Sequence, residues 1–227
     1  MSRRNKLEKF AALLRLPNVY ENFSGQEASL SGQKGIQADL KGKWASAHFK
    51  NENPLVLELA CGRGEYTVGL ARMFPDVNFI GVDVKGARIW KGATQAIDEG
   101  LDNAAFLRSR IELIDRYFSP GEIDEIWITF PDPFLKKANR RLTAKAYLDA
   151  YQRILKPGGL IHLKTDSPMM YSFTLQSVTN HEQAVLLSHT DDLYSRPLYS
   201  KELAIQTFYE KKHLAPGDAI RYILFRM

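Results

Sequence analysis

The residues around Asp132 carry the clearest chemical pattern in this chain. An apolar run that favours β-structure, residues 126–130, leads into a carboxylate that stands between Pro131 and Pro133. Because each proline fixes its own φ angle and disfavours a helical residue before it, this segment predicts a stiff loop at the end of a strand. In open α/β sheets, ligands bind at that edge. Asp132 is therefore a candidate reactive carboxylate, and an Asx-turn between the prolines is the structural alternative.

Basic residues follow this carboxylate, with no acidic residue between Pro133 and Leu148. They are Lys136, Lys137, Arg140, Arg141 and Lys145. The net charge of +5 lies elsewhere, because residues 1–50 hold nine Lys and Arg against four acidic residues. A basic terminus often only keeps a chain soluble. Two basic clusters beside a fixed carboxylate, however, favour chemistry on a nucleic acid.

A short glycine loop, with Gly62 and Gly64, follows the first strong strand pattern. Glycines at such a turn let a ligand lie against the backbone, and the following helix offers amide donors. A dinucleotide fingerprint would need a third glycine where Thr67 stands, which disfavours a nicotinamide dehydrogenase. Glu58, four residues before Gly62, instead suits the α-ammonium group of S-adenosylmethionine. Alone, a Gly-x-Gly pair is weak evidence, because it is also found in simple tight turns.

Asp83 ends the second predicted strand, 25 residues after Glu58. A carboxylate at this strand tip can accept both hydroxyl groups of a ribose. The alternative is that Asp83 caps the predicted helix at 86–99. With the glycine loop upstream, ribose binding is favoured.

Alternating strands and helices must position these residues. Strands are predicted at 55–60, 78–83, 104–107, 125–130 and 160–164, each followed by a helix. Regular β-α alternation of this kind is typical of a doubly wound parallel sheet. Two late strands, at 184–188 and 219–225 with a helix at 201–213 between them, are expected to form an edge pair with one antiparallel strand.

The length of 227 residues and an apolar content of 44% allow one sizeable core. We expect one domain at 51–227 and a basic, partly flexible arm at 1–50, with a short helix at 5–14 and a Gly/Ser/Gln-rich stretch at 24–35. No apolar run is long enough to span a membrane, and none follows the basic start as in a secretory signal. Cys61 is the single cysteine, which excludes an intramolecular disulfide and a cysteine metal cage. These features indicate a cytoplasmic protein with no metal site and no membrane contact.

Several segments together resemble the bacterial tRNA (guanine-N7-)-methyltransferase family. The resemblance extends over residues 50–213, approximately, and the Phe-Pro-Asp-Pro block and the Thr-Asp strand end are its most specific parts. The matching motifs are Glu58-x-Ala-x-Gly-x-Gly, Gly81-Val82-Asp83, Phe130-Pro131-Asp132-Pro133-Phe134-x-Lys136-Lys137, Arg140-Arg141-Leu142-Thr143, Gly158-Gly159-x-x-His162-x-Lys164-Thr165-Asp166 and Thr207-x-Tyr209-Glu210.

The resemblance implies a Rossmann-like class I methyltransferase sheet of about seven mostly parallel strands with an antiparallel edge strand. It implies transfer of a methyl group from S-adenosylmethionine to N7 of a guanosine in the variable loop of tRNA, position 46 in the usual tRNA numbering. The enzyme would act as a monomer or homodimer with no obligate protein partner. Implied cofactor contacts are Glu58, Gly62, Gly64, Asp83, Arg110 and Asp132, with Asp132 also catalytic, and implied substrate contacts are Lys136, Asp166, Thr207 and Glu210.

The chain departs from the family pattern in three places. Ala60 stands where the family usually has a glycine, a change that close backbone approach should tolerate. Arg110 stands where many members have an acid or Asn, so an adenine contact there is expected from the backbone or another side chain. The segment between Lys137 and Arg140 is shorter than usual and lacks the common His and Lys, so details of phosphate contact are not transferred.

Further side chains carry weaker expectations. Thr207 and Glu210 are three residues apart on a predicted helix and should share a face, either solvated or leaning over the guanine pocket. Asp166 has the alternative of capping the helix that begins near Pro168. The cations at 136–141 are expected to contact phosphates, together with Arg3, Arg4, Lys6 and Lys9 of the arm.

Aromatic and small residues complete the expectations. Trp44, Phe134 and Tyr209 are candidates to stack on the target base, with packing as the alternative for each. His162 alternates with apolar residues along a strand and is interpreted as a buried structural histidine. Cys61 is interpreted as a small loop residue, not a nucleophile.

Two other functions remain open from the sequence. A small-molecule methyltransferase would explain the glycine loop and Asp83. It would not explain the two basic clusters, in residues 1–50 and 136–145. A non-catalytic tRNA-binding module is disfavoured by the joint presence of Glu58, Asp83 and Asp132.

Overall fold

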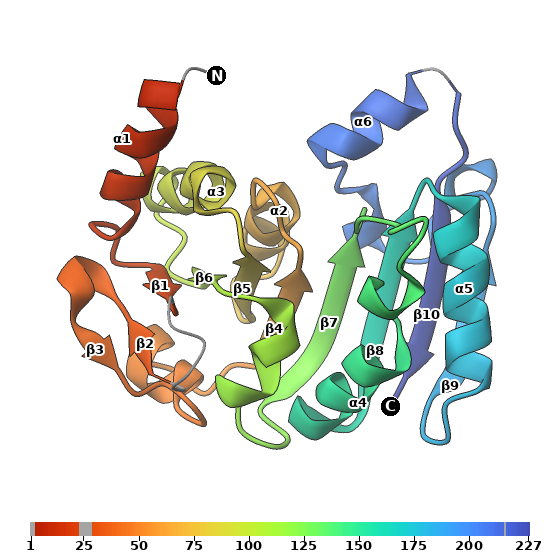
Figure 1. Ribbon diagram of the computed structural model, residues 1–227, viewed down its shortest axis with the longest axis horizontal. Helices are drawn as coiled ribbons and strands as arrows, with labels where there is room; N and C mark the ends of the chain where they lie inside the picture. Colours follow the sequence, from red (N-terminus) through yellow and green to blue (C-terminus); the bar gives the residue numbers. More distant parts are fainter. Residues whose placement is uncertain (1–2, 23–28, 216) are drawn as a thin grey trace.

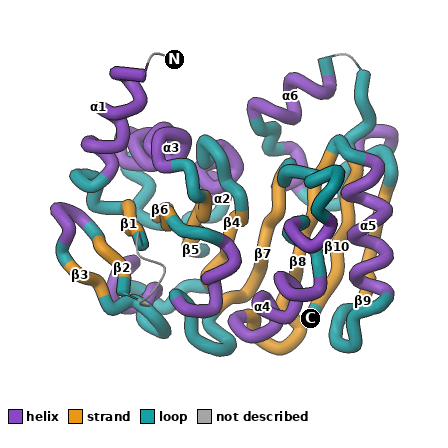
Figure 2. Tube along the Cα trace, in the orientation of Figure 1, coloured by secondary structure: helices purple, strands orange, loops and turns teal. Residues whose placement is uncertain are grey.

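A computed structural model describes residues 3–22, 29–215 and 217–227. Ten strands in this part of the chain form one sheet in the order β3-β2-β1-β6-β5-β4-β7-β8-β10-β9, and helices flank it (Figures 1 and 2). The α-helices are α1 (Arg3–Leu13), α2 (Glu65–Met73), α3 (Gly86–Asp98), α4 (Lys145–Ile154), α5 (Pro168–Thr179) and α6 (Phe208–Leu214). Short 3-10 helices are η1 (Gln33–Gly35), η3 (Ile111–Arg116), η4 (Ala138–Arg140), η5 (Leu193–Ser195) and η6 (Lys201–Ala204), and η2 (Trp44–Phe49) is a π-helix.

Five parallel strands form the centre of the sheet, which confirms the predicted β-α alternation. They are β4 (Leu55–Leu59), β5 (Asn78–Asp83), β6 (Ala104–Arg108), β7 (Ile123–Thr129) and β8 (Leu155–Thr165). Since they are parallel, their carboxyl ends meet at one edge of the sheet. The chain builds outward from β4 to β6 on one side and from β7 to β8 on the other, so a topological switch point lies between β4 and β7.

The antiparallel edge is also confirmed. Strand β10 (Arg221–Arg226) runs antiparallel between β8 and β9 (Val185–Thr190). The predicted helix between the two late strands is divided, because the chain leaves η6 and starts α6 only at the cap residue Thr207.

The strand count exceeds the expected seven because residues before β4 add three short strands. They are β1 (Val19–Glu21), β2 (Leu30–Ser31) and β3 (Gln37–Ala38), and β1 pairs in parallel with β6. Glu21 and Arg108 form an ion pair at 2.9 Å across that junction. The described part of residues 1–50 therefore packs against the sheet, while the division into an arm and a domain stays a prediction. Residues 24–28 of the predicted Gly/Ser/Gln-rich stretch lie outside the described residues.

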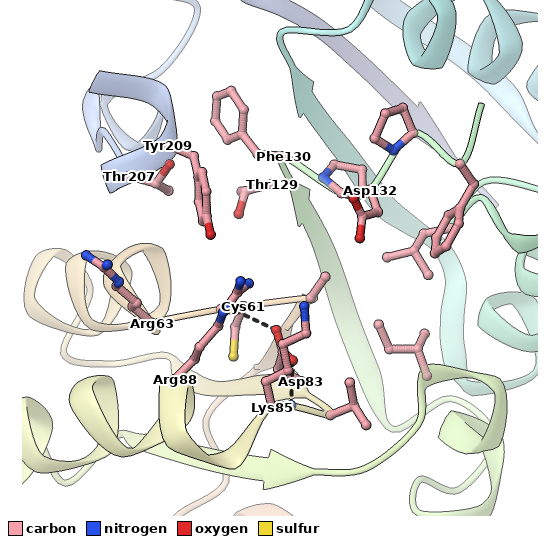
Figure 3. Close-up of a pocket in the computed structure, with 18 of the residues that line it drawn as sticks. Cys61, Arg63, Asp83, Lys85, Arg88, Thr129, Phe130, Asp132, Thr207 and Tyr209 are labelled. Atoms are coloured by element: carbon pink, nitrogen blue, oxygen red, sulfur yellow. Dashed lines mark hydrogen bonds between the residues drawn. The ribbon is translucent and has the colours of Figure 1, made fainter. Parts of the chain in front are cut away.

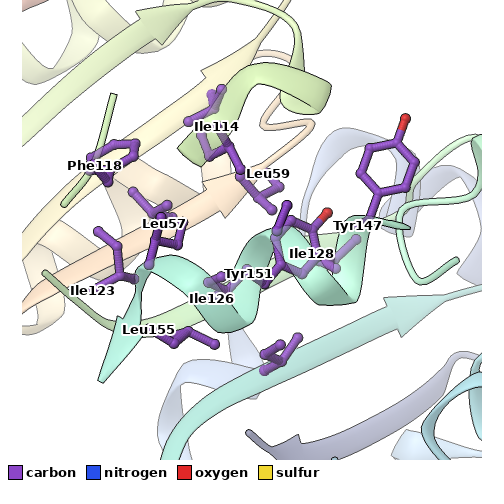
Figure 4. Packing of buried hydrophobic residues seen from close by; sticks show 14 of the residues in the cluster. Leu57, Leu59, Ile114, Phe118, Ile123, Ile126, Ile128, Tyr147, Tyr151 and Leu155 are labelled. Carbon is purple, nitrogen blue, oxygen red and sulfur yellow. The ribbon is translucent and has the colours of Figure 1, made fainter. Parts of the chain in front are cut away.

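Alternate side chains of each central strand point to opposite faces of the sheet, and each face has its own apolar core. On one face, α1, α2 and α3 cover Val56, Phe79 and Trp127. On the other, η2, η3, α4 and α5 cover Leu57 and Ile126 among others (Figure 4). The two cores keep the central strands rigid, and with them the loops at their carboxyl ends. No helix in the described ranges is long and apolar enough to cross a bilayer.

Candidate active site

A cavity of about 680 Å³ opens at the carboxyl edge of the parallel strands (Figure 3). The loops that follow β4, β5, β6, β7 and β8 line it, and the start of α6 closes one side. Of the residues expected in the site, Gly62, Asp83, Arg110, Asp132, Asp166 and Thr207 line this cavity. Glu58, Gly64, Lys136 and Glu210 do not.

The glycine loop turns through left-handed backbone conformations at Ala60, Gly62 and Gly64, with φ angles of 60°, 55° and 70°. Gly62 lines the cavity. Gly64 serves packing, because a Cβ atom there would lie 2.5 Å from the Phe106 ring. A contact between Gly64 and a cofactor therefore stays a prediction, while its need for glycine has a structural cause.

The Asp83 carboxylate is fixed by two backbone amides. The Gly62 amide donates to Oδ2 at 2.9 Å, and the Lys85 amide donates to Oδ1 at 2.7 Å. Lys85, not Asp83, is the cap residue of α3, so the capping alternative is wrong. Each carboxylate oxygen retains accepting capacity on the side of the cavity, as a pair of ribose hydroxyls requires.

Glu58 lies buried beneath the loop. It accepts hydrogen bonds from the Thr67 amide at 2.8 Å, from the Thr67 hydroxyl at 2.5 Å and from the Thr129 hydroxyl at 2.7 Å. Burial raises the pKa of Glu58 to about 7, against these hydrogen bonds and with a smaller contribution from the charge of Asp83. Glu58 thus ties the start of α2 to the end of β7, and its predicted contact with a cofactor ammonium group is not visible in the lining of the cavity.

Asp132 projects into the cavity from the loop after β7 (Figure 3). Its carboxylate is exposed, and within the described residues it accepts no hydrogen bond, so the Asx-turn alternative is not what this loop adopts. Phe130 and Phe134 on either side have φ angles of 50° and 39°, which are rare for bulky residues. Backbone strain of this kind persists only where the surrounding structure enforces it, and it is concentrated at functional sites.

Arg141 enforces the shape of this loop from behind. Its Nε donates to the Pro133 carbonyl oxygen at 2.9 Å, its Nη2 donates to the Phe134 carbonyl oxygen at 3.4 Å, and its guanidinium lies over the Phe173 ring at 4.5 Å. Because Arg141 is buried, the expectation that it contacts phosphate was wrong. Lys136, Lys137 and Arg140 are exposed, and Arg140 lines the cavity.

Asp166 and Thr207 line the cavity from two different elements. Asp166 follows β8 and lies 3.6 Å from Nε2 of His213 on α6. Ser167 caps α5, so the capping alternative for Asp166 is wrong. Thr207 lines the cavity and also caps α6, accepting a hydrogen bond from the Glu210 amide at 3.1 Å.

Glu210 is fully buried, so the solvated-face alternative is wrong for this residue. Its carboxylate pairs with Lys164 on β8 at 2.8 Å and accepts a hydrogen bond from the Tyr194 hydroxyl at 2.5 Å. Burial lowers the pKa of Lys164, while the charge of Glu210 opposes that shift. The pair fastens the segment with Thr207 to the strand that precedes Asp166. Substrate contact by Glu210 stays a prediction.

Comparison with known proteins decides the family. A family described as putative methyltransferase matches residues 52–222. A curated tRNA (guanine-N(7)-)-methyltransferase of Bacteroides thetaiotaomicron is 48% identical over 224 residues, which are 99% of this chain and 86% of that protein. One of Christiangramia forsetii is 46% identical over 230 residues, covering all of both chains. This chain belongs to the tRNA (guanine-N7-)-methyltransferase family.

Solved structures place this methyltransferase among class I folds. The 16S rRNA methyltransferase KamB aligns with a TM-score of 0.62 over 85% of this chain and 96% of its own, at 12% identity. A ribosomal A1408 methyltransferase from an uncultured bacterium aligns with a TM-score of 0.59 over 85% of this chain and 97% of its own, at 15% identity. At such identities the likeness shows a shared fold and not a shared substrate.

The residues of the cavity fit the cofactor of this methyltransferase family, S-adenosylmethionine. Asp83 offers two fixed acceptor oxygens at a strand tip, and Gly62 gives close access to the backbone. Val84 and Ile111 add apolar surface beside Asp83, while Ser109 and Arg110 lie where the adenine contact was expected. Arg110, two residues after the end of β6, is exposed.

Sequence reasoning missed several lining residues of this methyltransferase. Ser109, Arg63, Lys85 and Arg88 line the cavity but belong to no motif, although each follows a strand end or starts a helix there. Tyr209 and Phe134, two of the candidates for base stacking, also line the cavity.

Three other expectations about single residues are settled by burial. Trp44 is buried and donates to the Tyr117 carbonyl oxygen, so its proposed stacking on a base was wrong. His162 is buried beside Tyr222 at 2.8 Å, which confirms its structural interpretation. Cys61 is buried, and burial together with the charges of Glu58 and Asp83 raises the pKa of its thiol, which opposes nucleophilic use.

Proposed function

We propose that this chain transfers the methyl group of S-adenosylmethionine to N7 of a guanosine in the variable loop of tRNA, at position 46. The observation that carries the proposal is that Asp83 and Asp132 line one cavity at the switch point of a methyltransferase sheet. Relatives that are 46–48% identical over nearly the whole chain are named tRNA (guanine-N(7)-)-methyltransferases, a name that covers the reaction and leaves the position in tRNA as part of the proposal.

The residues of the chain divide the work between two ends of the cavity. At the end formed by β4, β5 and β6, Asp83 would accept the ribose hydroxyls, and Val84 and Ile111 would hold the adenine between them. Glu58 would act from below by fixing Thr67 and Thr129, and the cofactor ammonium group would bind above it. When bound, S-adenosylmethionine supplies an electrophilic methyl group on a sulfonium centre.

At the other end, Asp132 would receive the guanine. N7 carries a lone pair and no proton, so methylation there needs no general base. What the enzyme must provide is approach at roughly 3–3.5 Å and alignment, which together are worth about 7–11 kcal/mol of the barrier. Asp132 would accept a hydrogen bond from guanine N1 or N2 and stabilise the positive charge that develops on the purine. Asp166 and Thr207 would position the base from the far wall.

Phosphate contacts would come from the exposed cations Lys136, Lys137 and Arg140. They position the tRNA without reading its sequence, and specificity would come from the shape of the tRNA and from an unstacked base that enters the cavity. We propose that the enzyme works in the cytoplasm, where tRNA is processed, as a monomer or homodimer without an obligate protein partner.

A transfer assay with methyl-labelled S-adenosylmethionine tests the proposal. Purified protein is incubated with bulk tRNA and, separately, with free guanosine and small nucleophiles. The expected result is label in tRNA alone, as 7-methylguanosine. Label in small acceptors would support the small-molecule alternative, and cofactor binding without transfer would support a non-catalytic tRNA-binding module.

A further inference from the structure

Two neighbouring aromatic side chains at the start of α6 are exposed beside the cavity. Phe208 is 45% exposed and Tyr209 is 38% exposed. Their rings meet edge to face, with centroids 5.7 Å apart. Tyr209 lines the cavity, whereas Phe208 stands outside its lining (Figure 3 shows Tyr209). The pair therefore leads from the surface into the site.

An arginine from another element lies beside each ring. The Arg63 guanidinium lies over the Phe208 ring at 4.1 Å, and the Arg88 guanidinium lies 5.8 Å from the centre of the Tyr209 ring. Both arginines line the cavity. A guanidinium can stack on a ring and still attract a phosphate group, so these rings lie in a surface that suits a polyanion.

The position of the rings is fixed in the free protein. The Phe208 amide donates to Oε2 of Glu65 on α2 at 2.7 Å, which anchors the first turn of α6. The buried pair of Glu210 and Lys164 anchors the same turn from below. Lys211 and Lys212, which follow on the helix, are exposed and add positive charge beside the rings.

From this arrangement we infer that Phe208 and Tyr209 form a stacking platform for two consecutive unpaired nucleotides of tRNA. Tyr209 takes the guanosine that is methylated, and Phe208 takes its neighbour at the mouth of the cavity. Unpaired RNA bases are typically held by aromatic rings and arginine planes, and a ring at a cavity wall beside one at its rim matches a base drawn out of its stack. This inference rests on the proposed function and adds the two residues that hold the unstacked segment.

Two single variants, Phe208→Leu and Tyr209→Leu, test the platform. Each substitution removes one aromatic ring but keeps an apolar side chain of similar volume. Affinity for tRNA is measured by filter binding over a series of salt concentrations, together with kcat and KM. Loss of a stacked base should weaken binding by roughly 5- to 150-fold. The slope of log Kd against log salt should stay unchanged, since stacking releases no counterions. Phe208→Tyr and Tyr209→Phe should restore the affinity.

The control is Tyr199→Leu, which removes an aromatic side chain that is 59% exposed and lies outside the cavity lining. It should bind tRNA like the wild type. All variants should bind S-adenosylmethionine normally, which shows that the fold is kept. Two results would contradict the proposed platform. One is wild-type affinity for tRNA in both ring variants. The other is a changed slope of log Kd against log salt in a variant whose affinity at a single salt concentration is unchanged.

A second experiment uses the unaltered protein. A tRNA with 5-iodouridine beside the target guanosine is irradiated in the complex, which joins the iodinated base to an aromatic ring stacked on it. Peptide mapping should identify Phe208, and a cross-link on another segment would contradict the platform. If the wild type makes no 7-methylguanosine at all, the proposed function fails first, while the affinities of the ring variants still decide whether the platform binds RNA.

Discussion

The guanidinium of Arg141 holds the carbonyl oxygen of Pro133 at 2.9 Å and thereby fixes the loop that carries Asp132. Arg141, which donates this hydrogen bond, is buried, whereas Arg140, the residue before it in the sequence, is exposed. The two arginines therefore have separable effects on activity, although the sequence presents them as one basic pair.

Replacing Arg141 by Gln should lower kcat strongly, because a shift of about 1 Å in a reacting group can cost about 100-fold. Affinity for tRNA and its salt dependence should stay unchanged, since this side chain meets no phosphate. Arg140→Gln is the matched control and should instead weaken tRNA binding and reduce the salt slope by about 0.7–0.9. Steady-state kinetics and binding in a salt series separate the two, and a reduced salt slope in Arg141→Gln would contradict its assignment.

The carboxylate itself is tested by Asp132→Asn, which keeps shape but removes charge. We expect kcat to fall by about 100- to 1,000-fold, the usual cost of losing one electrostatic group at the reacting centre. Binding of S-adenosylmethionine, measured by calorimetry, should change little because Asp83 holds the ribose. A kcat near wild type with intact cofactor binding would remove Asp132 from the chemistry.

Burial of Glu58 should make stability depend on pH. Its pKa is raised from 4.5 to about 7, so between these pH values the folded protein keeps a proton that the unfolded chain has released. The free energy of unfolding should therefore fall as pH rises, by up to about 1.4 kcal/mol per pH unit from this group, and level off above pH 7.

Glu58→Gln should lack this contribution while its amide keeps the contacts with Thr67 and Thr129. Urea unfolding of both proteins from pH 5 to 8 measures the difference. We expect the free energy of unfolding of the wild type to fall relative to that of Glu58→Gln as the pH rises. If it rises instead, the folded protein stabilises the ionised carboxylate and the account of Glu58 is contradicted.

Ala60 should be a point of backbone strain. A left-handed conformation costs a non-glycine residue roughly 1–2 kcal/mol, and replacement by glycine removes this strain. Part of the stabilisation is offset because glycine loses more conformational entropy than alanine when the chain folds. Ala60→Gly should thus stabilise the protein by about 1 kcal/mol. Ala11→Gly on α1 is the same chemical change in a helix and should destabilise it, by at most about 1 kcal/mol. Denaturant midpoints compare the two, and destabilisation by Ala60→Gly would show that Ala60 is not strained.

Periodicity predicted the central fold because buried parallel strands and amphipathic helices are long enough to show a pattern. Strand β1 has three residues and no pattern of its own, and its partners on β6 lie far along the chain, as the ion pair between Glu21 and Arg108, 87 positions apart, illustrates. Such a partner cannot be identified from the local sequence, so the sheet was expected to end at β6, without β1, β2 and β3.

The site shows the same limit. Residues at or shortly after the end of a strand, such as Asp83, Asp132 and Asp166, were placed correctly at the cavity because the topology puts them there. The burial of Glu210 was not foreseeable, because it depends on Lys164, which is 46 positions away along the chain and lies on another element. Chain position thus predicts which residues reach the edge of the sheet, and tertiary partners decide which of them turn inward.

The most direct test maps the modified nucleotide in tRNA treated with the wild type and with Asp132→Asn. Borohydride reduction and aniline cleavage break the chain at 7-methylguanosine, and sequencing reads the position. The expected result is one cleavage site in the variable loop, at position 46, for the wild type and a strongly reduced signal for the variant. Methylation of another atom or base, or an equal signal from Asp132→Asn, would contradict a guanine-N7 site built around this carboxylate.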